Sequence, residues 1–362
     1  MMCPACVAEI PDEDLFCENC GIKLGDSVTD LRPAPQLPGC ICGAPATEVD
    51  EDGFCLRCGL RAHRNSPLGA AREPQPSDHI ELPLSPNFAA VSDRGRKHAK
   101  NEDRFAIFES NRAQAIVVCD GVSTSSDAEV ASAAVSEGVL ESLAVALSSA
   151  SSASPLDHAN AVRQAIAAGA AALNSHANPY TDENPPSTTV VAALVIDGAA
   201  TIGWLGDSRA YWIDLPDSPS PAVAIPLTQD HSWLNAVVGS GEMTPELAAR
   251  SPQAHAITRW IGADATEELE IDLVRHPIPA SNGILLLCTD GLWNYFPTPE
   301  SMAQAVHTAV QNASQNSRDA LAIARQLVDL ANRRGGHDNI TAAVLQIKQI
   351  HAPESGEPAR ED

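Results

Sequence analysis

The chain has 362 residues, of which 44% are hydrophobic and 4% aromatic, and its formal net charge is −24. This hydrophobic share is enough for a buried core, so the composition excludes a chain that is disordered throughout. The acidic balance argues against nucleic acids and anionic membrane surfaces as partners, because both attract basic patches.

Membrane and secretory segments are not expected. No apolar stretch reaches the roughly 18 residues of a membrane-spanning helix, and the first residues lack the charged and apolar regions of a secretory signal. We therefore expect a cytoplasmic protein with no membrane partner. Eight of the ten cysteines fall within the first 58 residues, in closely spaced pairs. In a reducing compartment this spacing favours zinc over disulfides.

The chain opens with two cysteine quartets, in residues 1–26 and 37–64. Each quartet can supply the four thiolates of a tetrahedral structural zinc site, so we expect two zinc ribbons that need the metal to fold. The alternative, isolated free thiols, is disfavoured by the spacing. Such ribbons dock protein partners or serve as spacers, and an acidic excess in this region disfavours nucleic acid. The eight candidate ligands are Cys3, Cys6, Cys17, Cys20, Cys40, Cys42, Cys55 and Cys58.

A proline-rich segment separates the quartets from the main body of the chain. Residues 65–86 contain five prolines and predict an extended, semi-stiff linker. The body is expected over residues 87–348. Residues 349–362 contain Pro and Glu and are expected to form a disordered tail.

Within the body, apolar runs alternate with Ala/Ser-rich stretches. Strands are predicted at 104–108, 115–119, 189–196, 200–205, 209–213, 284–289 and 340–347. Helices are predicted at 127–149, 155–178, 232–238, 244–250, 299–312 and 317–334. Blocks of strands separated by helix pairs indicate a layered α+β fold rather than repeated βαβ units. Cys119 and Cys288 lie inside apolar runs and are interpreted as core residues.

Two of the apolar runs end in Asp-Gly, at Asp120-Gly121 and Asp290-Gly291. Each break places a carboxylate at the end of a buried strand, where glycine lets the backbone turn sharply. Carboxylates gathered at strand ends would repel one another unless cations lay between them, and hard divalent ions prefer such oxygen ligands. One Asp-Gly alone would be ordinary turn sequence. Further acidic residues stand in similar settings, namely Glu102, Asp103, Asp207 and Asp338.

Six short motifs follow one another in a recognisable order. They are Asn101-Glu102-Asp103, Asp120-Gly121, Ser187-Thr188-Thr189, Gly206-Asp207-Ser208-Arg209, Asp290-Gly291 and Asp338-Asn339. This ordered set resembles the metal-dependent serine/threonine protein phosphatases of the protein phosphatase 2C family, over about residues 88–347. The resemblance extends to 227–232 and 243–246. It implies a central β-sandwich flanked by helix pairs, in αββα layers, here preceded by two small zinc ribbons.

The resemblance also implies a metal centre. The Asp120 carboxylate would bridge two Mn²⁺ or Mg²⁺ ions, the Gly121 carbonyl would join one of them, and Asp290 and Asp338 would complete the first ion's shell. A water bridging two such ions loses a proton at neutral pH, and the hydroxide would attack the phosphorus of a phosphoserine or phosphothreonine. Nearby cations would offset the charge on the phosphoryl oxygens.

The remaining roles concern a second ion, a third ion and the substrate phosphate. Glu102 and Asp103 would hold the second ion, partly through water, and Asp207 would help to bind a third, looser ion, although Gly-Asp-Ser is also common turn sequence. Family members usually carry a phosphate-binding arginine three residues before the Asn of the first motif, where this chain has His98. We therefore expect His98, with Lys100 nearby, to contact phosphate. The general acid stays unassigned.

These observations predict an enzyme of signal transduction that hydrolyses phosphoserine and phosphothreonine in proteins. Its zinc ribbons would recruit a serine/threonine kinase or the substrates of one. The alternative is a catalytically weak pseudophosphatase that binds phosphoproteins as an adaptor. Retention of Asp120, Asp290 and Asp338 favours catalysis, whereas the missing arginine favours the adaptor. A nucleic-acid-binding zinc-ribbon protein is a third possibility, which the net charge disfavours.

Overall fold

The structure is a computed structural model that describes residues 76–149, 156–176, 184–215, 221–251, 253–254, 256–263, 269–279, 281–313 and 319–347. The eight cysteines expected to bind zinc, the first part of the expected linker and the C-terminal tail lie outside these described residues.

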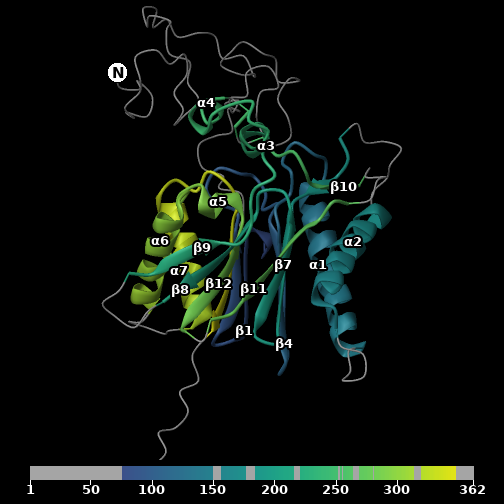
Figure 1. Ribbon diagram of the computed structural model, residues 1–362, viewed down its shortest axis with the longest axis vertical. Helices are drawn as coiled ribbons and strands as arrows, with labels where there is room; N and C mark the ends of the chain where they lie inside the picture. The colour runs from purple at the N-terminus through teal and green to yellow at the C-terminus, as the bar shows by residue number, and fades with distance from the viewer. Residues whose placement is uncertain are drawn as a thin grey trace, which may run out of the picture. The chain divides into compact units, whose positions relative to one another are not determined.

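Two antiparallel sheets form the centre of the body (Figure 1). The first has the strand order β1-β2-β13-β12-β8-β9, with bounds β1 His79–Ser85, β2 Phe88–Asp93, β13 Ile340–Ile347, β12 Gly283–Cys288, β8 Arg209–Asp214 and β9 Val223–Pro226. The second has the order β11-β7-β6-β4-β3, with bounds β11 Asp272–Pro277, β7 Ala199–Leu205, β6 Val190–Ile196, β4 Ala113–Cys119 and β3 Arg104–Glu109. A short pairing joins β5 (Ser187–Thr188) to β10 (Ile261–Gly262).

Helix pairs cover the outer faces of both sheets, as Figure 1 shows. Helices α1 (Ala128–Ser149) and α2 (His158–His176) pack on the second sheet, and α6 (Pro299–Ala313) and α7 (Ala320–Arg333) pack on the first. The shorter elements are the 3₁₀ turn η2 (Pro76–Asp78) and the helices α3 (Trp233–Gly239), α4 (Pro245–Ala248) and α5 (Asp290–Trp293). The predicted α+β sandwich with αββα layers is therefore confirmed for the body.

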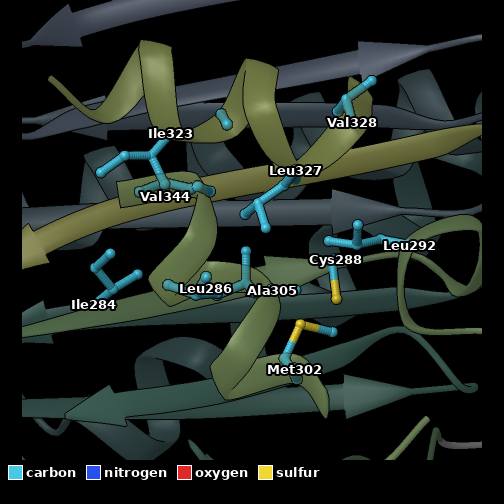
Figure 2. Close-up of a cluster of buried hydrophobic side chains, with 14 of the residues drawn as sticks. Ile284, Leu286, Cys288, Leu292, Met302, Ala305, Ile323, Leu327, Val328 and Val344 are labelled. Carbon is cyan, nitrogen blue, oxygen red and sulfur yellow. The ribbon is translucent and has the colours of Figure 1, made fainter. Parts of the chain in front are cut away.

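The layering explains why the central strands are apolar without interruption. Successive side chains of a strand point to opposite faces, and here both faces are covered. In β6, residues 190, 192 and 194 pack towards α1 and α2, whereas 191, 193 and 195 pack between the sheets. In β12, Leu286 and Cys288 pack with α6 and α7 (Figure 2), whereas Leu285 and Leu287 fill the space between the sheets. The two body cysteines are buried and free, as expected.

The sequence predicted no apolar stretch long enough to span a membrane, but helix α1 meets that criterion. Residues 128–148 are long enough and apolar enough to cross a membrane by length and composition alone. The fold accounts for part of their apolar character, because Ala131, Val135, Val139 and Leu143 are fully buried against α2 and the second sheet, whereas Val145 is exposed. The sequence-based search for a continuous apolar stretch missed this helix because polar residues interrupt it.

The predicted boundary between linker and body, at residue 86, is wrong. Residues 79–85 form strand β1, which pairs with β2 at the edge of the first sheet, so the body begins before residue 87. Prolines suggested an unpaired segment, but an edge strand tolerates proline because one side of it needs no hydrogen-bond partner. The edge strands β9 and β11 were missed for a related reason: they are half exposed and carry no long apolar run. The short inner strand β2 was also missed.

Candidate active site

The candidate carboxylates gather at one end of the two sheets. Asp120 directly follows β4, and Asp207 and Asp290 lie two residues after the ends of β7 and β12. Glu102-Asp103 directly precede β3, and Asp338 lies two residues before β13. In an antiparallel pair the end of one strand lies beside the start of the next. The register shows this directly, because residue 119 pairs with 104 and residue 288 pairs with 342. The folding pattern therefore collects six acidic residues from five chain segments.

The two Asp-Gly glycines serve a different purpose from the one predicted. Neither Gly121 nor Gly291 has a positive φ, so neither is required by a left-handed turn. Instead, other backbone passes too close for a side chain. A Cβ on Gly121 would lie 2.6 Å from the carbonyl oxygen of Ala128, and one on Gly291 would overlap the carbonyl oxygen of Asn339. The expectation of a sharp glycine turn was wrong, and close backbone approach is the reason for glycine.

The Ser187-Thr188-Thr189 motif fixes the backbone of Asp120. The Thr188 hydroxyl and the Thr189 amide both donate to the Asp120 carbonyl oxygen at 2.8 Å. The Thr189 hydroxyl accepts from the Asp120 amide at 3.2 Å and lies 2.8 Å from the Ser208 hydroxyl. These bonds link the Asp120 strand end to the Gly-Asp-Ser-Arg turn, so the motif positions two of the candidate ligands relative to each other.

Asp103 is the most deeply buried of the acids, with no exposed surface. One carboxylate oxygen, Oδ2, accepts from the hydroxyls of Thr289 and Thr341, each at 2.7 Å. The other, Oδ1, is buried and has no hydrogen-bond partner among the described residues. Sequence reasoning missed both threonines, because a single hydroxyl beside an acidic motif has no sequence signature of its own.

The acids disfavour one another's ionisation. Burial, followed by neighbouring carboxylates, raises the pKa of Asp120 and of Asp290 well above the usual range. Burial raises the pKa of Asp103 to about 7, against the lowering effect of its threonine partners. Burial and the nearby Asp230 raise the pKa of Asp207 to about 6. Four carboxyl groups are thus held in a place where their negative charges are unfavourable.

Divalent cations fit this donor set. Carboxylate oxygens are the ligands that Mg²⁺ and Mn²⁺ prefer, and a bound cation would reverse the unfavourable charge that raises these pKa values. The partnerless Asp103 Oδ1 provides an oxygen available to such a centre. Among the residues that the structure describes, no three or more His, Cys, Asp or Glu side chains are already arranged as a metal cage. Charge and donor chemistry, rather than a closed cage, therefore support cation binding.

A pH dependence of stability follows for the metal-free protein. The pKa values of Asp103 and Asp207 are higher in the folded chain than in the unfolded one, so the folded state binds more protons between about pH 4 and 7. The folded state is favoured at low pH, and this contribution is lost as the pH rises through that window. In EDTA we expect a lower Tm at pH 8 than at pH 5.5.

Thermal unfolding with and without Mn²⁺ measures this effect. Saturating Mn²⁺ should reduce the change of Tm with pH, because the bound cation takes the place of the protons on the carboxyl groups. Asp290→Asn should also reduce the change of Tm with pH in EDTA, because it removes one of the repelling charges. A Tm in EDTA that rises from pH 5.5 to 8 would contradict the repulsion described above.

The residues expected to contact phosphate lie at the edge of the acidic cluster. His98 Nε2 is 3.3 Å from Asp338 Oδ1, and the His98 carbonyl oxygen accepts from the Arg94 guanidinium. The Lys100 ammonium is 2.8 Å from Glu129 Oε1, at the start of α1. The structure thus brings His98 to a candidate metal ligand, whereas Lys100 is engaged with a carboxylate of the neighbouring helix.

Asn339 ties the loop before β3 to the Asp338 segment. Its side-chain oxygen accepts from the Glu102 amide at 2.7 Å, and its side-chain nitrogen donates to the carbonyl oxygens of Arg94 and Lys100. The Glu102 carboxylate in turn accepts from the Ser123 hydroxyl at 2.6 Å. These bonds hold Glu102 beside the other acids.

Comparison with known proteins assigns this arrangement to a family. A protein-family model described as protein phosphatase 2C matches residues 93–330, which include almost all of the cluster. The chain belongs to the protein phosphatase 2C family. The resemblance inferred from the six motifs is therefore confirmed, and so is the prediction of an enzyme of the metal-dependent serine/threonine protein phosphatase class.

Several bacterial phosphatases are similar to this chain. The serine/threonine phosphatase stp of Listeria monocytogenes is 29% identical over 257 residues, which cover 70% of this chain and 93% of that protein. The Mycobacterium tuberculosis serine/threonine phosphatase PstP/Ppp has a TM-score of 0.54 and 28% identity, covering 72% of this chain and 98% of that one. The PstP catalytic domain in complex with two manganese ions has a TM-score of 0.52 and 27% identity, and the match covers 74% of this chain and 97% of that one.

Proposed function

We propose that this protein phosphatase 2C member hydrolyses phosphoserine and phosphothreonine in proteins, with two Mn²⁺ or Mg²⁺ ions held by its acidic cluster. The observation that carries the proposal is the group of buried carboxylates whose pKa values are raised by burial and by one another. The similarity to a PstP catalytic domain that binds two manganese ions supports the same conclusion.

Each acidic residue has a proposed role in binding the metal ions. Asp120, Asp290 and Asp338, with the Gly121 carbonyl, would hold one or both ions. Glu102 and Asp103 would support the second, and Asp207 a third. Divalent cations supply Lewis acidity, which polarises the phosphoryl group and makes a water nucleophilic at neutral pH. The threonine hydroxyls on Asp103 and the backbone bonds to Asp120 keep the carboxylates in place, so that little reorganisation is needed during the reaction.

Phosphate release from a phosphothreonine peptide tests the proposal. We expect release with Mn²⁺ and none with EDTA, and restored release when Mn²⁺ is added back, because removal of the ions removes the Lewis acid. Equal release in the presence of EDTA would refute a metal-dependent mechanism. Saturable peptide binding without release at any Mn²⁺ concentration would favour the pseudophosphatase adaptor, for which the histidine at position 98 is the supporting observation.

His98 is proposed to contact the substrate phosphate. Its position 3.3 Å from the Asp338 carboxylate places it beside the cluster and leaves it partly exposed. We expect His98→Ala to lower kcat/KM about tenfold for both p-nitrophenyl phosphate and a phosphopeptide, since one charge-assisted hydrogen bond is lost. Lys97→Ala, which changes an exposed neighbouring cation, is the matched control. Unchanged kinetics of His98→Ala on both substrates would remove His98 from the site.

The cysteine quartets are proposed to bind two structural zinc ions and to dock a partner, either a serine/threonine kinase or its substrates. The proposal rests on the spacing of the eight cysteines. Elemental analysis of the full chain should find about two zinc equivalents, and a preparation that contains none would refute it.

A further inference from the structure

A pocket of about 350 Å³ lies beside the acidic cluster. Asp207 belongs to both, so the pocket begins at a candidate metal ligand. Its walls come from separate elements: Leu234 belongs to α3, Trp293 to α5, and Pro226 to the end of β9. The Trp293 indole donates to the Asp207 carbonyl oxygen at 3.0 Å, which fixes this wall to the acidic cluster.

Among the described residues that line the pocket, Arg209 is the one cation, and its charge is already neutralised. The Arg209 guanidinium donates to both carboxylate oxygens of Asp230, at 2.8 and 2.7 Å. It also donates to the Tyr211 hydroxyl at 3.0 Å and lies 3.6 Å from the centre of the Trp293 ring. A bidentate ion pair stacked on an aromatic ring offers little to a further charged group. Arg209 and Asp230 therefore form a wall, and neither is available to pair with a charged ligand.

Three further polar side chains of the walls, those of Ser232, Asn235 and Thr228, are also engaged. The Ser232 hydroxyl accepts from the Asn235 amide and caps α3, and the Asn235 side chain donates to the Asp230 carbonyl oxygen at 2.8 Å. The Thr228 hydroxyl accepts from the Ala210 amide at 3.1 Å. The surface left for a ligand is mainly apolar and is provided by Pro226, Leu234, Ala254, Trp293, Pro297 and Pro299.

We propose that this pocket binds an apolar side chain of the phosphoprotein substrate, from a residue close in sequence to the phosphorylated one. The inference rests on the proposed function and adds a sequence preference to it. Asp207 lines the pocket and also belongs to the acidic cluster, so the two sites adjoin and a residue next to the phosphorylated one can reach the pocket while the phosphate lies in the cluster. The volume is at the small end for binding sites and suits one or two amino-acid side chains.

Matched phosphothreonine peptides test the pocket. One set carries Leu, Ala, Lys or Glu in turn at each of the two positions before and the two positions after the phosphothreonine. We expect the full chain with Mn²⁺ to prefer Leu over Lys and Glu roughly tenfold in kcat/KM at one of these positions, as is typical of an apolar pocket. Leu234→Asp should reduce that preference to within about twofold. The matched control is Leu247→Asp, an exposed leucine of α4 outside the pocket, which should keep the preference.

The readout separates specificity from general damage. A structural defect lowers kcat/KM for all peptides alike, whereas loss of the pocket changes their ratio. Leu234→Trp, which fills the pocket without adding charge, should also remove the preference and serves if Leu234→Asp does not fold. Equal hydrolysis of all peptides by the unaltered chain, or a preference that survives both variants, would overturn the pocket proposal alone. Failure to hydrolyse any phosphopeptide or p-nitrophenyl phosphate would overturn the proposed function as well.

Discussion

Asp290→Asn should lower Mn²⁺-dependent phosphate release from a phosphothreonine peptide by about a thousandfold or more. The reason is that the substitution removes one charge from the carboxylate set proposed to hold the ions, and Lewis-acid stabilisation is worth several kcal/mol of the activation barrier. Asparagine has nearly the same shape as aspartate. The Asn294 side chain donates to Asp290 Oδ2 at 3.2 Å and can donate to the amide oxygen of the substituted asparagine in the same way.

The same variant should not be less stable without metal. Asp290 raises the pKa of Asp120, and its own pKa is raised by burial and by Asp338. Removing its charge relieves this repulsion, so in EDTA the Tm of Asp290→Asn should equal or exceed that of the unaltered chain. Saturating Mn²⁺ should raise the Tm of the unaltered chain by more than that of the variant.

Two comparisons decide this prediction. Asp329→Asn, at an exposed position of α7, makes the same chemical change away from the cluster and should leave both activity and Mn²⁺ stabilisation intact. Activity of Asp290→Asn within tenfold of the unaltered chain, at the same Mn²⁺ concentration, would show that this carboxylate does not hold a catalytic ion.

Gly291→Ala should abolish activity and lower stability by several kcal/mol, of the order found for overpacking and strain at buried backbone. An added Cβ would overlap the carbonyl oxygen of Asn339, and neither the Asn339 backbone nor α5 can give way without moving Asp290 or Asp338. Asn339 also holds Glu102 through its side chain, so the displacement would spread to a third acid.

Circular dichroism melts and phosphate release measure the two effects. Gly198→Ala is a control for the general cost of replacing glycine, because a Cβ there meets nothing within 4 Å and the site lies in the β6–β7 hairpin, although its φ of +70° adds backbone strain. This control should lose stability but keep activity. Full activity of Gly291→Ala would show that the close approach to Asn339 does not fix the site.

The central strands and the acids at their ends could be predicted from the sequence because burial leaves a clear local pattern. A buried strand with both faces covered is a continuous apolar run, and a carboxylate that ends such a run is conspicuous; Asp120 and Asp290 could therefore be found from local pattern alone. The edge strands β1 and β11 lack this signal, because much of their surface is exposed and they contain proline and charged residues. These strands could be found only from their pairing partners.

The contacts that assemble the site were beyond local reasoning. Thr289 and Thr341 donate to Asp103 from 186 and 238 residues away in sequence. Such a contact depends on which strands become neighbours, and a lone threonine gives no hint of it. The same holds for Lys100. Its closeness to His98 in the sequence predicted a contact with phosphate, but in the fold its ammonium lies beside the Glu129 carboxylate. The glycine of each Asp-Gly was also recognised for the wrong reason, since the backbone that excludes a side chain belongs to another element or segment, at Ala128 for Gly121 and at Asn339 for Gly291.

The place of β13 has a consequence for the newly made protein. This last strand lies between β2 and β12, in the interior of the first sheet, and Asp338 lies two residues before it. A nascent chain on the ribosome therefore lacks the strand that joins β2 to β12, and Asp103 lacks its partner Thr341, until residues 338–347 have left the exit tunnel. Phosphatase activity cannot precede the emergence of residues 338–347, and a chain truncated before residue 338 exposes two unpaired apolar strand edges that invite aggregation.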